Sequence, residues 1–207
     1  MAFCTNQEWQ SRGGGTETID RLDSAPGAIV RGCFGQRFTK RWVDGDLNDV
    51  VSTASGKRFR LDAKTLLTWE HQPPKGELFE FGGLKETLQL DAPPAVPRWQ
   101  FRLETGPGLV WAFQPELTPE EIAEGAERPP EVVGSYAVFD RWGRKVGHVL
   151  RPLAMDADGK LAWLTLSVNA QPPWGVFLTI TGDNAWFATA RYPVTIKLAI
   201  IALLVEI

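Results

Sequence analysis

The chain has 207 residues, of which 43% are hydrophobic, so it is long enough to bury a core in one large β domain or two small ones. Its formal net charge of -3 offers no basic face, and we therefore expect no nucleic-acid partner. Nine tryptophans and eleven phenylalanines suit a sandwich core, and equally a surface that holds sugars or protein.

Residues 1–25 are polar, include the run Gly13-Gly14-Gly15, and predict an N-terminal arm or loosely held segment. An arm that becomes ordered on a neighbouring subunit is the alternative. The segment has no basic region followed by an apolar run, so we expect no secretory signal. Cys4 and Cys33 match neither a C-x-x-C motif nor a zinc spacing. Both a disulfide between them and two unpaired thiols stay open.

Short apolar stretches separated by turn residues predict an N-terminal β part over residues 26–96. A hairpin is expected where 77–81 and 86–90 flank Gly82-Gly83-Leu84-Lys85. The proline-rich stretch 91–97 is a candidate boundary to a C-terminal β-sandwich domain over residues 97–196. Before the hairpin, further strands are expected at 28–34, 36–43, 58–61 and 65–71.

Beyond residue 97, Trp99, Phe101 and Leu103 alternate with polar residues, which predicts a half-buried strand with one wet face. The stretch 131–139 is apolar on both faces and is expected to be a central strand. Further strands are expected at 109–113, 145–150, 161–168 and 176–180.

One short helix is expected at about 118–125. Thr118 can cap it, Pro119 occupies the first helical position, and Glu121 can complete a capping box. Gly125 can end it in the left-handed conformation. The pattern as a whole predicts an all-β fold, an antiparallel β-sandwich or two packed β subdomains, with this one helix.

The C-terminal stretch is nearly all apolar, yet it is shorter than the about 20 residues that span a bilayer, so no membrane span is expected. Residues 197–207 predict a final buried strand or an assembly segment, and we expect this apolar end to be covered. The candidate assembly contacts are Ile196, Leu198, Ile200, Ile201, Leu203 and Leu204.

Candidate metal ligands are few. Asp44, Asp46 and Asn48 have the first ligand spacings of an EF-hand, but the later glycine and glutamate positions do not match. Asp156 and Asp158 before Gly159 predict a hairpin turn, with a calcium ligand pair as the alternative. No cofactor is expected, and calcium at this turn is the alternative.

Catalytic motifs are equally sparse. With two histidines, His71 and His148, a site of several zinc-binding histidines is excluded. Gly134-Ser135-Tyr136 lies inside an expected strand and not at a nucleophile elbow, and His148 is interpreted as a strand histidine. Paired carboxylates for glycoside hydrolysis would have to meet in three dimensions. Three tryptophans near loops are candidates for stacking on a sugar ring: Trp142, Trp174 and Trp186.

The run FQPELTPEEIAEGAERPPEVVGSYAVFD resembles a module of uncharacterised phage and prophage proteins with the signature QP-x-LT-x-EEI-x-x-G-x-x-RP-x-x-VVGSYAV. The resemblance continues through HVLRP at 148–152, the Asp158-Gly159 turn, Trp163-Leu164 and ARYPVTI at 190–196. It is strong over residues 110–196 and loose over 36–70. Asp-Pro-Thr usually follows the last motif in the family, whereas Lys197-Leu198-Ala199 follows here, so a downstream binding domain is not implied.

The resemblance implies a non-enzymatic structural component of a phage or prophage particle, a homo-oligomer or a partner of other particle proteins. It brings no catalytic residues. Such a protein would be made in the host cytoplasm and located in the virion or at the extracellular surface after assembly. The alternatives are a carbohydrate-binding module that uses loop tryptophans on a glycan, and a β-sandwich enzyme that degrades glycans.

Overall fold

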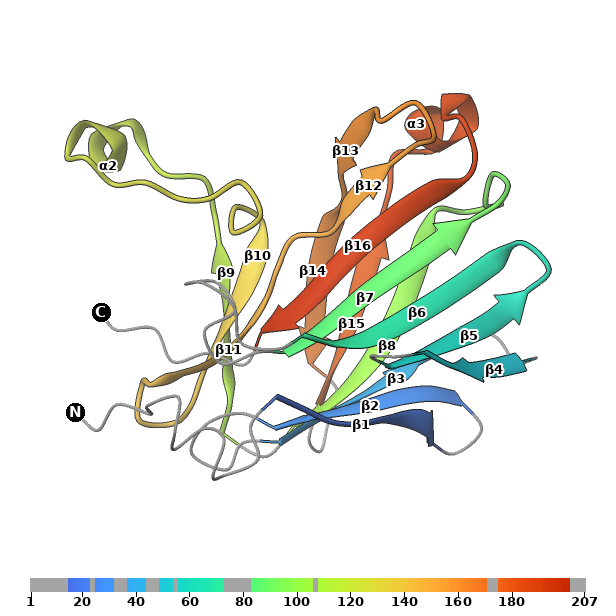
Figure 1. Cartoon of the computed structure of the whole chain (residues 1–207). Helices are drawn as coiled ribbons and strands as arrows, with labels where there is room; N and C mark the ends of the chain where they lie inside the picture. The colour runs from blue at the N-terminus through green and yellow to red at the C-terminus, as the bar shows by residue number, and fades with distance from the viewer. Residues whose placement is uncertain are drawn as a thin grey trace.

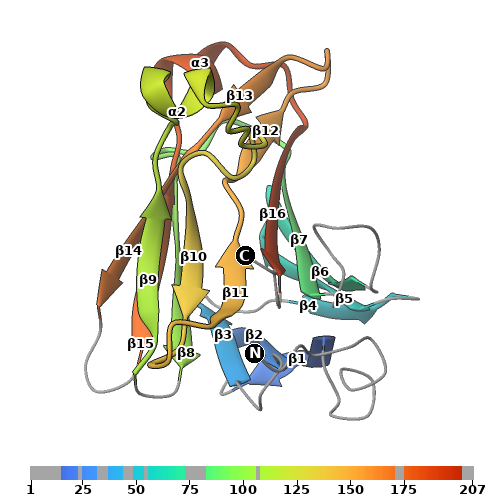
Figure 2. The ribbon, with the colours of Figure 1, turned by 90° about the vertical axis from the view of Figure 1, so that its left-hand side faces the viewer.

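The computed structural model describes residues 15–22, 25–31, 37–43, 49–53, 56–72, 83–105, 108–170 and 175–201. Antiparallel strands in two sheets make up most of this part of the chain, which confirms the predicted all-β, sandwich-like fold. Figure 1 shows the strands of both sheets in the body of the molecule, with one strand connection projecting at the upper left, and Figure 2 shows the same ribbon turned by 90°.

The smaller sheet has six strands in the order β1-β2-β3-β8-β15-β14. Strand β3 pairs with β8, so that Lys40 lies opposite Leu103, and this pairing joins the first strands of the chain to the second half. The bounds are β1 Gly15–Leu22, β2 Ala25–Arg31, β3 Arg37–Trp42, β8 Arg98–Thr105, β15 Gly175–Thr181 and β14 Thr165–Ala170.

The larger sheet has ten strands, eight of them in the order β4-β5-β6-β7-β16-β11-β10-β9. The short strand β12 pairs with β16 and with β13. The bounds are β4 Asp49–Ser52, β5 Gly56–Asp62, β6 Thr65–Gln72, β7 Gly83–Leu90, β16 Val194–Ile201, β11 Lys145–Val149, β10 Ser135–Phe139, β9 Val110–Gln114, β12 Leu153–Met155 and β13 Leu161–Trp163.

The sheets do not follow the domain boundaries expected from the sequence. Residues 15–22, placed in a loose N-terminal arm, form strand β1 instead. Strands on either side of residue 97 pair in both sheets, β3 with β8 and β7 with β16, and one core cluster extends from Trp42 to Ile200. The proline-rich stretch therefore connects two strands of one core and does not separate two domains.

The core follows from period-two alternation, because successive side chains of a strand point to opposite faces. In β8, Trp99, Phe101 and Leu103 are buried while Arg98 and Arg102 are exposed, as predicted. Strand β15 repeats the pattern with buried Val176, Leu178 and Ile180.

Strand β16 is an interior strand of the larger sheet. One of its edges pairs with β7 along its whole length, and the other pairs first with β12 and then with β11. Its inward side chains are only 2–4% exposed at Ile196, Leu198 and Ile200. Of the two alternatives expected for this segment, a final buried strand or an assembly segment, the structure shows the buried strand up to Ile201. The three residues, which were also candidate assembly contacts, pack in the core of their own chain.

The helix α2, Pro119–Ala123, has the predicted ends. Thr118 accepts from the backbone N–H of Glu121 at 3.2 Å, and the Glu121 carboxylate accepts from the Thr118 N–H at 2.7 Å, which confirms the capping box. Gly125 has a φ of +89°, the left-handed conformation expected after the helix. No helix among the described residues is long and apolar enough to cross a membrane.

Some element boundaries differ from the sequence prediction. Residues 131–134 form turns, so the strand predicted at 131–139 is restricted to β10. Strand β7 begins at Gly83 and pairs with β6, while the predicted partner at 77–81 lies outside the described residues. A second helix, α3 (Asn184–Thr189), was missed, although Asp183 caps it by accepting from the Ala185 N–H at 2.9 Å.

Candidate functional site

The connection between β9 and β10 projects away from both sheets, at the upper left of Figure 1. We call residues 115–134 the arm. The two ends of the arm lie close together, because the flanking residues Gln114 and Ser135 are opposite each other in the β9–β10 pair. The Gly134 N–H also donates to the Gln114 carbonyl at 2.7 Å. The arm is therefore an excursion from the turn end of a β-hairpin.

The arm buries little of its own surface. Helix α2 contains no buried residue, and the Ile122 side chain is 59% exposed. On β9, Phe113 at the arm's base is 51% exposed, and Val110 at the other end of the strand is 57% exposed. Because β9 is the last strand in the order of the larger sheet, its outer backbone edge has no partner among the strands that the structure describes. Unpaired edges and exposed apolar groups are features of contact surfaces.

The arm is acidic. It carries six glutamates and one arginine, and the arginine, Arg128, donates to the Pro115 carbonyl within the arm. At the opposite side of the molecule in Figure 1, strand β5 presents exposed Arg58 and Arg60. The acidic arm and these two arginines thus lie at opposite sides of the molecule.

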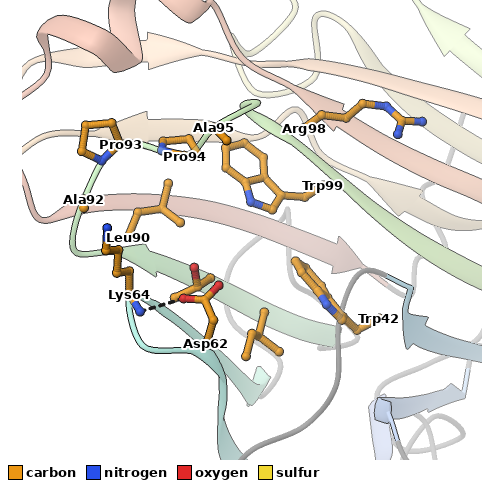
Figure 3. A pocket seen from close by; sticks show the side chains of 12 residues that line it. Trp42, Asp62, Lys64, Leu90, Ala92, Pro93, Pro94, Ala95, Arg98 and Trp99 are labelled. Carbon is orange, nitrogen blue, oxygen red and sulfur yellow. Dashed lines mark hydrogen bonds between the residues drawn. The ribbon is translucent and has the colours of Figure 1, made fainter.

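A pocket of about 540 Å³ opens where the two sheets meet near the 91–97 connection. Figure 3 shows the Trp42 and Trp99 side chains on its wall. The Leu90 side chain lies below the Pro93-Pro94 part of the 91–97 connection. Both indoles are more than 90% buried, and each packs against another aromatic ring, Trp42 on Phe101 and Trp99 on Phe187. The charged groups of the pocket are those of Asp62, Lys64 and Arg98.

The tryptophans chosen from the sequence do not meet in one place. Trp142 is 62% exposed, but the guanidinium groups of Arg141 and Arg144 lie 4.0 and 4.8 Å from its ring. Trp186, on α3, packs edge-on against Phe187. Neither lines either of the two described pockets. Trp174 lies outside the described residues.

Trp42 and Trp99 were not chosen from the sequence as ligand-binding residues. Both lie on strands with an alternating apolar pattern, and this pattern predicts core side chains. No local sequence pattern indicates that this end of the core opens to solvent. A second pocket, of about 320 Å³, lies at the base of the arm and is lined by Phe113, Glu116, Arg151 and neighbouring residues. Among the described residues, each of these two pockets has a single carboxylate, from Asp62 or Glu116, whereas glycoside hydrolysis uses two.

The Asp156 carboxylate belongs to a hairpin turn between β12 and β13. One oxygen accepts from the N–H groups of Asp158 and Lys160 at 2.9 and 2.8 Å, and the other from the Arg191 N–H at 3.3 Å. Burial by itself raises the pKa of this carboxyl, but the three backbone donors outweigh it and lower the pKa. Asp158 pairs with Arg191 at 2.7 Å.

The same turn is built again at Asp140 between β10 and β11. Asp140 accepts from the N–H groups of Trp142 and Arg144 at 2.9 and 3.0 Å, and Gly143 has a φ of +76°, matching Gly159 at +81°. The repeat of D-x-x-G followed by a basic residue accounts for both aspartates as turn residues. Among the described residues, no group of three or more His, Cys, Asp or Glu side chains is placed to hold a metal ion.

Ser135 and His148 form a buried pair that was not foreseen. The Ser135 hydroxyl and His148 Nε2 lie 2.5 Å apart on neighbouring strands, and the residues are 0% and 2% exposed. Burial and, secondarily, the charge of Lys145 lower the pKa of His148 to about 3. A serine–histidine contact is a nucleophile–base arrangement only where substrate can reach it, and these two side chains are enclosed. They stabilise the β10–β11 pair.

The remaining candidate residues lie in parts that are not described. These are Cys4, Cys33, the 44–48 loop, Leu203 and Leu204, together with the side chain of Ile201. Comparison of the chain with protein-family models, with curated proteins and with solved structures gave no match.

Proposed function

We propose that this protein is a non-enzymatic structural component of a phage or prophage particle and assembles by placing the arm of one copy on the β5 face of the next. The observation that carries this proposal is the arm itself, an excursion whose helix has no buried residue. The sequence signature that resembles phage and prophage proteins runs through the arm and into β10, which adds independent support.

Charge complementarity favours a second copy as the occupant. The arm carries six glutamates, and the exposed side chains of β5 include Arg58 and Arg60, at the other side of the same molecule. A contact between two different surfaces is head-to-tail, and repeated head-to-tail contacts close into a ring or extend as a filament. Exposed Phe113 and Ile122 supply apolar surface to bury in the contact.

The arm can be removed without changing strand register. Replacing residues 115–134 with Asn-Gly joins the opposed Gln114 and Ser135 through a two-residue turn. We expect the intact chain to form a defined oligomer in light scattering at low salt and the arm-deleted chain to be a monomer. The double variant Arg58→Glu/Arg60→Glu is expected to dissociate the oligomer as well, because it reverses the charge that the arm meets.

Lys160→Glu, on the exposed β12–β13 turn, is the matched charge-reversal control and should leave the oligomer intact. Circular dichroism of every variant checks that the fold is kept. An arm-deleted chain that retains the oligomer would contradict the proposal, as would an intact chain that stays monomeric at high concentration.

The pocket lined by Trp42 and Trp99 favours a second candidate function, binding of a glycan. Its indoles, aliphatic wall and charged groups from Asp62, Lys64 and Arg98 combine apolar surface with hydrogen-bonding groups, as sugar rings require. Titration with oligosaccharides is expected to quench tryptophan fluorescence if this function holds, and Trp99→Phe should abolish most of the change. An unchanged spectrum across a glycan panel would remove this candidate.

A further inference from the structure

Lys40 and Glu86 form a buried pair that bridges the two sheets. Lys40 is on β3 of the smaller sheet and Glu86 on β7 of the larger one, and the Lys40 Nζ contacts Glu86 Oε1. Lys40 is 0% exposed and Glu86 is 2% exposed. Lysine and glutamate are almost never buried to this extent unless they are paired, as these two are.

Aromatic side chains surround the pair. The Lys40 Nζ lies 3.8 Å from the centre of the Phe101 ring and 6.0 Å from that of Trp69. Trp69, opposite Glu86 on β6, donates its indole N–H to Glu86 Oε2 at 2.8 Å. Neither Lys40 nor Glu86 lines either of the two described pockets.

From this geometry we propose that Lys40 and Glu86 condense into an amide that covalently joins the two sheets. The two reacting groups belong to the chain and already touch, so the reaction needs no access from solvent. Groups held together in this way react as if at very high concentration, which compensates for the slow reaction of an amine with a carboxylic acid in water.

The step balances without a co-reactant. The Nζ lone pair attacks Glu86 Cδ, and the C=O electron pair moves onto Oε2, where the Trp69 N–H can stabilise it. The C=O bond then re-forms as the bond from Cδ to Oε1 breaks. Oε1 leaves as water, carrying the carboxyl proton and one proton taken from Nζ, with which it is in contact.

The surroundings favour the reactive forms. Burial lowers the pKa of the Lys40 amine and raises that of the Glu86 carboxyl, and for both groups the attraction of the partner's charge is the smaller effect. The neutral amine has the lone pair needed for attack, and the neutral acid can release water. The product is an uncharged amide whose carbonyl can keep the Trp69 N–H as its donor, so condensation also removes the cost of two buried ionisable groups.

The test is the mass of the wild-type chain under denaturing conditions after incubation of the folded protein at neutral pH. We expect a loss of one water molecule and, after trypsin digestion, one branched peptide that joins the Lys40 and Glu86 sequences. Trp69→Phe removes the indole donor and should slow the conversion on the order of 100-fold. Lys40→Met should keep its full mass.

Glu86→Gln provides a matched control, because the same attack on a carboxamide would release ammonia in place of water and give an identical branched peptide. A folded wild-type chain that retains its full mass would overturn the proposal. So would a loss of water that maps to the Asp158-Gly159 turn, where an aspartate side chain can cyclise onto the following backbone nitrogen. The inference goes beyond the proposed assembly and does not depend on it.

Discussion

Replacing Gly182 by alanine is expected to destabilise the protein by about 3 kcal/mol, because the new methyl group has no room. A Cβ at this position would lie 2.2 Å from Cε2 and 2.9 Å from Cδ2 of Phe187. The Phe187 ring cannot easily move, since its centre is 5.6 Å from that of Trp99 and 4.9 Å from that of Trp186. Urea unfolding followed by fluorescence measures the loss.

A double-mutant cycle tests the cause. In a Phe187→Leu background the ring that clashes with the methyl group is absent, so Gly182→Ala should cost less than half of what it costs in the wild type. An equal cost in both backgrounds would show that contact with the Phe187 ring does not determine the effect. Phe187 is 2% exposed, so its own truncation will also destabilise the chain.

Lowering the pH from about 7 to about 5 is expected to remove about 2 kcal/mol of stability through His148 alone. The folded-state pKa of His148 is lowered to about 3, whereas in the unfolded chain it returns to about 6.5. Between these values the unfolded chain binds a proton that the folded chain does not. Stability is therefore full above the unfolded pKa and decreases as the pH falls toward the folded one.

The measurement is the free energy of urea unfolding at the two pH values for the wild type and for His148→Gln, in which the amide replaces the imidazole near Ser135. The variant should lose much less stability over the same interval. His71 is present in both proteins, so its contribution cancels. The Asp140 and Asp156 carboxyls, whose pKa values are lowered in the fold, act at more acidic pH. Equal losses in both proteins would show that His148 is not the responsible group.

Much of the fold could be predicted from local patterns. The alternation in β8 and the cap at Thr118 each depend on neighbouring residues, and the structure confirms both. Pairing partners could not be predicted in this way. Strand β7 pairs with β6 and β16, and the choice between partners depends on packing between residues far apart in the sequence.

The candidate sites were harder to predict, because they depend on side chains that share a location only after folding. Charged residues are expected on the surface, so the residue types alone do not predict that Lys40 and Glu86 are buried. One signal was nevertheless present: Glu86 occupies the same strand face as Leu84, Leu88 and Leu90, which are all buried. A single charged residue on an otherwise apolar strand face therefore indicates a buried charge that pairs with another residue.

The position of β16 has a consequence for how the chain folds during synthesis. This strand follows all the other described strands in sequence, yet it lies between β7 and β11 in the middle of the larger sheet. Until it emerges from the ribosome, the edges of β7 and β11 have no β16 to pair with. Before β16 is added, the two halves of the larger sheet therefore have unpaired edges and exposed apolar surface. At this stage folding is slow, and association with other chains is a hazard.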